Sequence, residues 1–414
     1  MKKLLIILLC LPFIGFGQGW EVALGSSVDD LGVSGQQTSD GGYIITGFTR
    51  GFGNGNLYAI YLVKTDAFGI EQWYNTFRLS DSLTSQGYSV QQTSDGGYII
   101  TGNTTISNST SPGGITKVAY LIKTDGNGIE QWRKNYVLGI SYSGYEVCQT
   151  TDGGYIIAGL ETGSTIIILI KTDSGGQVQW NQTFFGALNY SNFPISIQQT
   201  TDGGYITACA SNTPFNAGLL IKTDNNGIEQ WRQTLAGTVY SVQETNDGGY
   251  IVTGFITVNG EHNCWLIKTD ISGIQQWAYN YGGRAAHSVR QTSEGGFIIL
   301  GDSMISIGNN GNKDIYLIKT DVNGTEQWSK IYGGIGYEVA NSVQQITDGG
   351  YILIGSTNSF GNGGYDVYLV KTDGNGNVTA EFTIPINSNR KLEKVVDILG
   401  RDINPEKNKP FIEI

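Results

Sequence analysis

The sequence predicts an all-β fold: a seven-bladed β-propeller of four-stranded antiparallel blades, with its ring closed by an N-terminal strand, plus a short C-terminal β tail. Three observations lead to this prediction. The string QQTSDGGYIITG stands unchanged at 36–47 and 91–102, and related strings occur five more times. A second string, KTD, follows each copy, and the segments between are short and rich in β-branched and aromatic residues. No apolar period of 3.6 residues accompanies the repeats, which excludes a helical solenoid.

The repeat unit is 45 to 57 residues long, measured between successive copies of one acidic residue in the first string. A period of this length is typical of propeller blades. The acidic residues are Asp40, Asp95, Asp152, Asp202, Asp247, Glu294 and Asp348. The lysines that begin the second string are Lys64, Lys123, Lys171, Lys222, Lys268, Lys319 and Lys371.

Each unit contains four strand-like segments, which in the second unit read YSVQQT, GYIITG, AYLIKTD and GIEQWRKNY. The string SDGG joins the first two segments and DGNG joins the last two. Both strings supply glycine for the positive φ angles that tight hairpin turns need. We therefore expect four antiparallel strands in each blade, with a hairpin turn at each of these sites.

The tryptophans predict how the ring is closed. The first six KTD strings are each followed by a Trp, and the seventh is not; an additional Trp20 stands in GWEVALG, before the first unit. We expect residues 20–24 to form the outer strand of blade seven, because this pairing hides open sheet edges. In the alternative, 377–384 completes blade seven and Trp20 lies beside it. The large rings are expected to dock against neighbouring blades: Trp20, Trp73, Trp132, Trp180, Trp231, Trp277 and Trp328.

The run DGGYIITG…YLIKTDGNGIEQW, over residues 20 to about 377, resembles the tryptophan-docked blades of quinoprotein-type propellers. It resembles more closely the DGGY-repeat propellers of secreted, Bacteroidetes-type proteins. The resemblance implies a propeller architecture and almost nothing about chemistry, because one such fold hosts many functions. It does not imply quinone-dependent oxidation, since those enzymes characteristically use adjacent cysteines beside the cofactor, and this chain has none.

The N-terminus, MKKLLIILLCLPFIGFGQG, has the layout of a secretory signal peptide, with two lysines, a short apolar run, and then small and polar residues. We predict a signal peptide at 1–18 and a secreted or outer-surface protein without a transmembrane segment after cleavage. A lipid anchor at Cys10 is less favoured, because Leu9 stands where such signals have a small residue. The net charge of −11 argues against nucleic-acid binding.

The propeller is predicted to span 19–377, and a tail of different composition follows at 378–414. Its string VVDILGRDINPEKN resembles the core of the C-terminal sorting domain of type IX secretion cargo, which implies recognition by that secretion machinery. Such domains normally continue with a further acidic, glycine-bearing strand, whereas this chain stops at Ile414, so a truncated gene and a variant signal both fit. The segment 391–403 predicts a short strand pair around Gly400 and Arg401.

Residues that recur in every blade are expected to build the blade, because a single ligand site does not require seven copies. In KTDAFGIEQW, pairing of Thr65 with Ile70 places Lys64 opposite Glu71, which predicts a cross-strand charge pair. The hairpin turns do not meet the spacing of an EF-hand, so we expect no metal or cofactor, with calcium at these turns as the alternative. The odd number of cysteines after the signal peptide predicts buried free thiols rather than disulfides: Cys148, Cys209 and Cys264.

The connections that vary between repeats predict where a ligand binds. The segments at 78–87 and 103–117 are long and that at 159–166 is short, and variable loops on a repeated scaffold usually carry function. Five residues before each first turn, a partial ring of aromatic side chains is expected around the axis, to stack on sugars or peptide side chains. Arg290, where most blades have Gln, would contact an anion. Alternatively, these aromatic side chains only pack between blades. The ring positions are Tyr88, Tyr145, Tyr240 and His287, with Val33, Ile195 and Asn341 in the other blades.

The sequence is poor in catalytic motifs. It has two histidines, His262 and His287, and no HxH, HExxH, CxxC or GxSxG pattern. We therefore expect a monomeric, non-catalytic module that binds an extracellular glycan or protein. A carbohydrate-active enzyme and a passive surface scaffold are the alternatives. The carboxylates open to glycoside hydrolysis, from which spacing selects no pair, are Asp29, Asp30, Asp81, Glu161 and Glu338.

Overall fold

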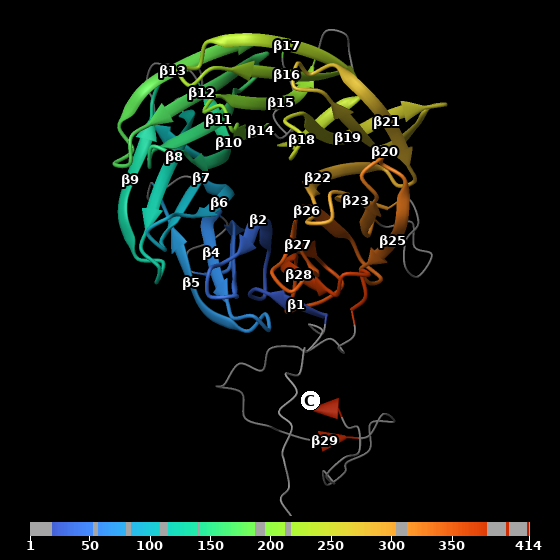
Figure 1. Ribbon diagram of the computed structural model, residues 1–414. Helices are drawn as coiled ribbons and strands as arrows, with labels where there is room; N and C mark the ends of the chain where they lie inside the picture. The colour runs from blue at the N-terminus through green and yellow to red at the C-terminus, as the bar shows by residue number, and fades with distance from the viewer. Residues whose placement is uncertain are drawn as a thin grey trace, which may run out of the picture. The chain divides into compact units, whose positions relative to one another are not determined.

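The computed structural model describes residues 19–52, 57–79, 84–107, 115–138, 141–186, 195–211, 217–303 and 313–378, and the strands Val395–Val396 and Ile412–Glu413. The regular secondary structure in these residues is entirely β-strand. Seven four-stranded antiparallel sheets surround one axis, which confirms the predicted seven-bladed propeller (Figure 1). This part of the chain contains no helix of the length and hydropathy needed to cross a membrane.

Blades 1 to 6 are each built from four strands that follow one another along the chain. Blades 1 and 2 consist of β2 (Asp30–Gln37), β3 (Tyr43–Thr49), β4 (Ala59–Thr65) and β5 (Glu71–Phe77), and of β6 (Ser85–Gln92), β7 (Tyr98–Ser107), β8 (Ile115–Thr124) and β9 (Glu130–Tyr136). Blades 3 and 4 consist of β10 (Tyr142–Gln149), β11 (Tyr155–Glu161), β12 (Ile166–Thr172) and β13 (Val178–Phe185), and of β14 (Ser196–Gln199), β15 (Tyr205–Ser211), β16 (Ala217–Thr223) and β17 (Glu229–Ala236). Blades 5 and 6 consist of β18 (Thr238–Glu244), β19 (Tyr250–Val258), β20 (Glu261–Thr269) and β21 (Gln275–Tyr281), and of β22 (Ala285–Gln291), β23 (Phe297–Asp302), β24 (Ile315–Thr320) and β25 (Glu326–Tyr332).

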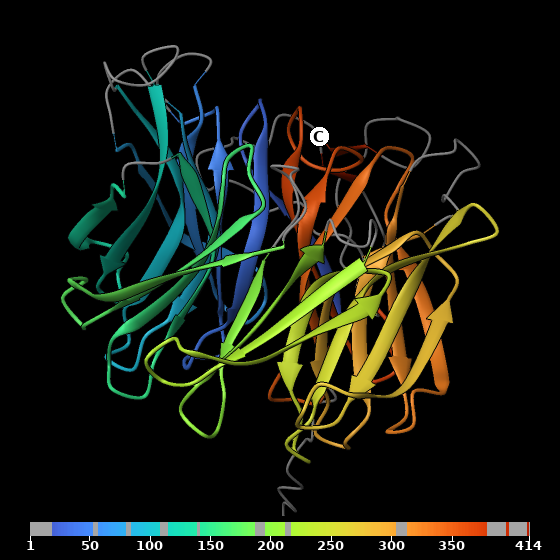
Figure 2. The same ribbon diagram turned by 90° about the horizontal axis from the view of Figure 1, so that it is seen from above.

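The first strand of each blade lies nearest the axis and the fourth lies at the rim (Figure 1). Seen across the axis, the strands run between two opposite faces of the ring (Figure 2). The predicted DGG and KTD hairpin turns join strands one to two and three to four, so they all lie on one face, here called the turn face. The other connections lie on the opposite face, here called the loop face.

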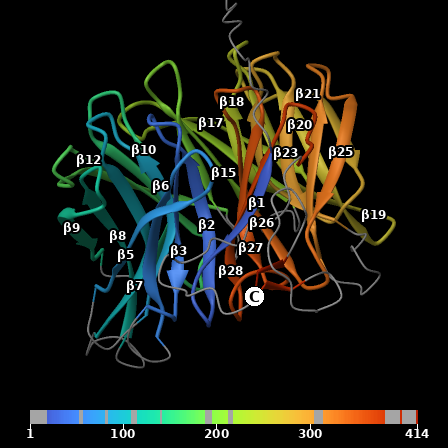
Figure 3. The same cartoon turned by 90° about the horizontal axis from the view of Figure 1, so that it is seen from below.

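Blade 7 closes the ring with strands from both ends of the propeller. It contains β26 (Glu338–Gln345), β27 (Tyr351–Thr357) and β28 (Asp366–Thr372), and its fourth strand is β1 (Trp20–Leu24). Trp20 lies opposite Lys371 and Leu24 opposite Val367. Figure 3 shows this N-terminal strand in blue among the red strands of blade 7. The predicted closure by residues 20–24 is confirmed, and the described residues after β28 form a turn rather than a fourth strand.

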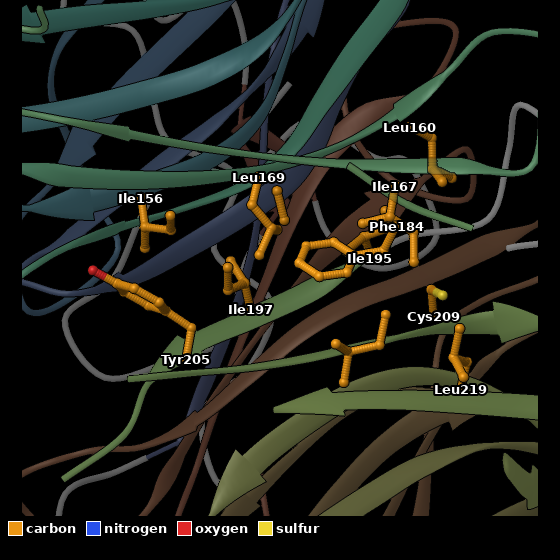
Figure 4. Packing of buried hydrophobic residues seen from close by; sticks show 12 residues of the cluster. Ile156, Leu160, Ile167, Leu169, Phe184, Ile195, Ile197, Tyr205, Cys209 and Leu219 are labelled. Carbon is orange, nitrogen blue, oxygen red and sulfur yellow. The ribbon is translucent and has the colours of Figure 1, made fainter. Parts of the chain in front are cut away.

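The hydrophobic core lies in the seams between neighbouring blades. Figure 4 shows the cluster between blades 3 and 4, in which Ile156 and Leu169 pack with Ile197 and Tyr205. Equivalent clusters fill the other seams. Each Å² of apolar surface removed from water contributes about 25 cal/mol, so burial of these side chains in the seams stabilises the ring.

A tryptophan from the outer strand of each blade contacts the next blade near the turn face. Trp73 lies against Gly128 in the next hairpin, and its ring centroid is 6.0 Å from that of Tyr98. Gly128 has a φ of 75°, and a Cβ atom there would collide with the Trp73 ring, so this position requires glycine. Trp20 makes the same contact with Tyr43, at 5.7 Å. The other pairs are Trp132 with Tyr155, Trp180 with Tyr205, Trp231 with Tyr250, Trp277 with Phe297 and Trp328 with Tyr351.

The buried lysines of the KTD strings pair with the aspartates of the DGG turns, so the predicted pair of Lys64 with Glu71 is wrong. A bulge between Lys64 and Thr65 shifts the register and places Lys64 opposite Trp73. Lys64 Nζ lies 2.9 Å from Asp40 Oδ2 and also donates to the Thr65 carbonyl. The same ion pair joins Lys123 to Asp95, Lys171 to Asp152, Lys222 to Asp202, Lys268 to Asp247 and Lys371 to Asp348.

Blade 6 departs from this pattern because it carries Glu294 in place of the aspartate. Lys319 Nζ still donates to the Thr320 carbonyl at 3.0 Å and to Gln327 Oε1 at 3.1 Å. It forms no ion pair within 4 Å among the described residues, and burial lowers its pKa even though Glu294 acts to raise it. The side chain of Glu294 is one methylene group longer than that of the aspartate in the other six blades, and in blade 6 the close ion pair is absent.

A girdle of hydrogen bonds joins all seven blades at the turn face. The residue that ends each inner strand accepts a hydrogen bond from a turn N–H of the preceding blade, as Gln92 Oε1 does from Ser39 N at 2.8 Å. Gln37 accepts from Thr347 N at 3.1 Å, and so carries the girdle across the closing seam. The other bonds run from Ser94 to Gln149, Thr151 to Gln199, Thr201 to Glu244, Asn246 to Gln291 and Ser293 to Gln345.

The residues from Ile384 to Ile414 form a separate compact unit. In it, β29 (Val395–Val396) pairs with β30 (Ile412–Glu413). The strand pair predicted around Gly400 and Arg401, most of the sorting-domain likeness and the signal peptide at 1–18 lie outside the described residues.

Candidate functional site

A cavity of about 350 Å³ lies on the axis of the propeller, lined by the inner strands. The ring positions predicted from the sequence all line it, and Arg290 does so as well. The structure therefore brings these residues together at one cavity, and their contact with a ligand stays a prediction. The ring residues are Val33, Tyr88, Tyr145, Ile195, Tyr240, His287 and Asn341.

A β-bulge places these residues in the cavity. In blade 2 the register between β6 and β7 shifts between Gly87 and Ser89, so Tyr88 has no partner in the ladder. A bulge leaves one residue unpaired and redirects its side chain. The same shift flanks Tyr145, for example, and occurs in every blade except blade 4, where Ile195 immediately precedes β14.

The aromatic residues of the cavity form two stacked pairs. The rings of Tyr88 and Tyr145 are 5.4 Å apart and nearly parallel, at 5°. Those of Tyr240 and His287 are 5.5 Å apart, at 1°. Each ring therefore covers one face of its neighbour, so part of the alternative, packing between blades, is also correct. The parts of these rings that line the cavity are what a molecule placed there would contact.

Neighbouring groups fix the aromatic pairs in place. Tyr88 Oη accepts from Asn103 Nδ2 at 2.9 Å and donates to Gln86 Oε1 at 2.9 Å. Burial raises the pKa of Tyr88 to about 12, even though the bond from Asn103 acts to lower it, so the phenol is neutral at physiological pH. Burial also raises the pKa of Tyr145 and Tyr240.

His287 is oriented by a buried carboxylate. Its Nε2 lies 3.1 Å from Oδ2 of Asp302, and Lys313 Nζ lies 3.3 Å from the same oxygen. Burial alone would raise the pKa of Asp302, but His287 and Lys313 outweigh it and hold this pKa below its usual value. Asp302 therefore stays ionised and positions the imidazole.

Serines form a second row in the cavity, one residue after the ring. The hydroxyls of five of them, all except Ser342, accept hydrogen bonds from N–H groups of the next blade, as Ser196 Oγ does from Val242 N at 3.2 Å. Glu146 replaces the serine in blade 3, and its Oε2 accepts from Ile197 N at 2.6 Å. The longer side chain keeps the bond between blades and adds a carboxylate to the cavity wall. The serines are Ser34, Ser89, Ser196, Ser241, Ser288 and Ser342.

Glu146 is the functional candidate that the sequence reasoning missed. Burial raises its pKa, although Arg290 and the bonds from Ile197 N and Ser196 act to lower it. Of the side chains that line the cavity, it is the one carboxylate. Alignment of the repeats would have revealed it, because six blades have Ser at this position.

Arg290 is the second departure from the repeat in the cavity. At its position Gln198 accepts from Glu244 N at 2.8 Å, which a guanidinium cannot do. Arg290 Nη1 instead donates to the carbonyl of Val289 at 2.7 Å. The cavity therefore carries one acidic group on blade 3 and one basic group on blade 6.

The predicted variable loops are partly strands. β7 continues to Ser107 and β8 begins at Ile115, so much of 103–117 is an extended hairpin, because its Thr and Ile residues suit paired strands. Residues 80–83, with Asp81, and 108–114 lie outside the described residues. The predicted loop carboxylates that are described do not line the cavity: Asp29, Asp30, Glu161 and Glu338.

The hairpin aspartates and the cysteines have structural surroundings. Asp66 Oδ1 accepts from the N–H groups of Phe68 and Ile70, and the equivalent aspartates cap their turns in the same way. Calcium at these turns stays a prediction. The cysteines are free, as predicted, with Cys209 and Cys264 buried and Cys148 half-buried.

The fold and the axial cavity define this chain as a seven-bladed β-propeller. No protein-family model matches it, and no curated protein matches its sequence. Among solved structures, it is similar to a protein of unknown function from Bacteroides caccae (15% identity, 68% of this chain and 92% of that chain, TM-score 0.43). It is also similar to a protein of unknown function from Dyadobacter fermentans (12% identity, 86% of this chain and 98% of that chain, TM-score 0.48). A third similar structure is Sqt1 of Chaetomium thermophilum bound to the N-terminus of ribosomal protein L10 (11% identity, 81% of this chain and 84% of that chain, TM-score 0.48). At these identities the likeness concerns the fold alone.

Proposed function

We propose that this protein is a secreted binding propeller whose axial cavity receives the end of an extracellular glycan. The observation that carries the proposal is where the repeats diverge. Residues that recur in every blade join strands and blades, whereas Glu146, Arg290 and the aromatic pairs interrupt the repeat at the cavity wall. Structure alone does not require these departures, because other blades do without them.

The polar groups of the cavity suit a ligand rich in hydroxyl groups. A serine hydroxyl that accepts a bond from a backbone N–H still has its own hydrogen to donate. Glu146 offers an acceptor and Arg290 offers several donors. Sugar hydroxyls donate and accept at once, so they complement such a mixed wall better than an apolar ligand does.

The size of the cavity favours the end of a chain over a folded partner. Its volume of about 350 Å³ lies in the range of small-molecule sites. The walls are held by hydrogen bonds between blades, so little rearrangement accompanies binding. The half-buried rings of Tyr145 and Tyr240 line the cavity and supply apolar contact for a sugar ring.

The test is a glycan and peptide array, followed by calorimetry with the best ligand. Glu146→Ser and Arg290→Gln each restore the residue that other blades carry, so the fold is kept. We expect each to weaken glycan binding at least tenfold, in line with loss of a charged hydrogen bond. Arg232→Gln, which removes an exposed arginine on the rim, is the matched control and should bind normally.

Three outcomes would contradict the proposal. Unchanged glycan affinity in both cavity variants would place binding elsewhere. An array that yields peptides and no glycans would favour a protein partner. Turnover of a polysaccharide, or defined oligomers without any ligand, would favour the enzyme or the scaffold.

The proposal includes export, which rests on the signal-like N-terminus and the sorting-like tail. Expression in a bacterium that possesses type IX secretion should give a mature protein that lacks residues 1–18, detected by mass spectrometry outside the cell. Retention of the full chain in the cytoplasm would contradict export.

A further inference from the structure

Two carboxylates are buried together in the seam where the ring closes. Asp30 begins β2 in blade 1 and Asp366 begins β28 in blade 7, and both residues are 0% exposed. Asp366 Oδ1 and Asp30 Oδ2 both lie next to the point that a Cβ atom on Gly25 would occupy. The two oxygens therefore face the same small space, which a glycine leaves open.

The hydrogen bonds around this space satisfy only part of the charge. Asp30 Oδ2 accepts from Ser26 N and, at 2.6 Å, from Ser26 Oγ, and Asp30 Oδ1 accepts from Thr49 Oγ1. Asp366 Oδ2 accepts from Asn362 N at 2.8 Å, whereas its buried Oδ1 has no hydrogen-bond partner. A buried carboxylate oxygen without a partner is costly, and the cost is removed by a proton or by a cation.

No ion pair joins a basic side chain to Asp30 or Asp366 among the described residues. Arg50 Nη1 is 3.2 Å from Oδ2 of Asp29, a neighbouring carboxylate at the surface. Burial, with Asp30 and Asp29 adding to it, raises the pKa of Asp366 to about 7 despite the bond from Asn362.

The same arrangement occurs once more, in the seam between blades 6 and 7. Asp314 Oδ1 and Glu338 Oε2 both lie beside the position of a Cβ atom on Gly333, and both residues are 0% exposed. Asp314 and Asp366 precede or begin the third strand of their blades, and Glu338 begins the first strand of the next. The carboxylate pair is therefore a repeated construction rather than a single accident.

Other seams show that the fold does not need acidic residues here. At the corresponding positions the seam of blades 1 and 2 has Ala59 and Ser85, and that of blades 2 and 3 has Val118 and Tyr142. All four are buried. The carboxylates at the closing seam thus have a role beyond packing.

We propose that the closing seam binds a calcium ion through Asp30 and Asp366, which clasps the first strand of blade 1 to the third strand of blade 7. Calcium takes six to eight oxygen ligands in flexible geometry, and it often completes its shell with peptide carbonyls and water. That property matters because the described residues contain no cluster of three or more acidic, histidine or cysteine side chains fit for a metal. The site is separate from the hairpin turns and from the axial cavity.

The test measures the calcium response of the full chain after treatment with a chelator. Thermal unfolding is followed while calcium, magnesium or sodium is added at constant ionic strength, and calorimetry gives the stoichiometry. We expect calcium at a hundred times its Kd to raise Tm by about 5 °C. Asp366→Asn and Asp30→Ser should each reduce this response by at least half, because the similar pair of Asp314 and Glu338 is left in place. Without calcium, Asp366→Asn should melt at or above the wild-type temperature.

Asp224→Asn is the matched control, because it alters a hairpin aspartate whose Oδ1 caps its own turn through the N–H groups of Asn226 and Ile228. This variant should keep the full calcium response. A wild-type Tm that does not respond to calcium would overturn the proposal, as would a response that is undiminished in both seam variants or is lost in Asp224→Asn. Should a seam variant fail to fold, calorimetric titration of the wild type with calcium, which must show binding, decides alone.

Discussion

The inner strands are nearly uniform in sequence at the turn face and variable at the axial cavity. At the turn face, the residue that ends each inner strand accepts the same hydrogen bond in all seven blades, and six blades share the same buried Lys–Asp pair. A few residues earlier, at the cavity, the same strands carry Val, Tyr, Ile, His and Asn at one position. The difference teaches that uniform positions hold the ring together, whereas divergent ones are free to contact a ligand.

The largest expected effect is the loss of stability at low pH, through the aspartates of the DGG turns. Asp40 shows the pattern: burial would raise its pKa, but bonds from Thr38, Lys64 and Gly42 N lower it to about 2, from an ordinary 3.8. A depressed pKa in the folded state adds stability above about pH 4, and this is lost as the pH falls towards 2. The same depression to about 2 recurs in Asp95, Asp152, Asp202 and Asp247.

We therefore expect Tm to fall steeply between about pH 4 and 2. Scanning calorimetry across this range measures it. In Asp202→Asn, Tm should fall less over this pH range, because one carboxylate fewer is protonated. A flat Tm down to pH 2.5 would show that these pairs do not stabilise the fold.

Removal of a docking ring should have the next largest effect. Trp231 contacts Gly273 and Tyr250 of blade 5, so Trp231→Ala should lower the free energy of unfolding by about 3 kcal/mol. Urea unfolding followed by circular dichroism measures this. Phe68→Ala, which truncates an aromatic ring that is 73% exposed on a hairpin, should change it by less than about 0.5 kcal/mol. Equal losses in the two variants would refute a special role of the tryptophan.

The lysine pairs allow a comparison between blades. Lys222→Met leaves the Thr223 carbonyl without its charged donor and breaks the pair with Asp202, so we expect a loss of about 2 kcal/mol. Lys319→Met removes similar backbone and glutamine bonds but no close ion pair, and should cost less. Chemical unfolding of both proteins tests the ranking, which fails if Lys319→Met is the more damaging change.

The smallest effect on stability is expected at the cavity. Glu146→Ser should leave the free energy of unfolding within about 0.5 kcal/mol of wild type, because a serine at this position satisfies the same N–H in other blades. Urea titration measures it beside the binding assay. A loss above 2 kcal/mol would mean that Glu146 stabilises the fold, so that the cavity and the turn face would not differ in this respect.

Much of this structure follows from the periodicity of the sequence. The number of blades, the strand order and the convergence of Tyr88, Tyr145, Tyr240 and His287 were predictable, because equal positions in a repeat occupy equal places around the ring. The partner of Lys64 was not, since a bulge of one residue reassigns every neighbour across a hairpin. Glu146 was visible as an exception to a pattern, but only a search for exceptions finds it.

The pairing of Asp30 with Asp366 was hidden for a different reason. The two residues lie at opposite ends of the propeller sequence, and no local pattern relates them. Ring closure alone brings β1, β28 and β2 together. Long-range geometry of this kind is accessible from the sequence only after the register of the closing strand is known.

The closing strand also has a kinetic consequence. Because β1 pairs with β28, residues near both ends of the propeller must be present before blade 7 acquires its fourth strand. Contacts between such distant residues form slowly, since the loop that they close is very long. An emerging chain thus remains an open arc with an unfilled edge until synthesis has passed β28. Only then can β1 pair with β28 and close the ring.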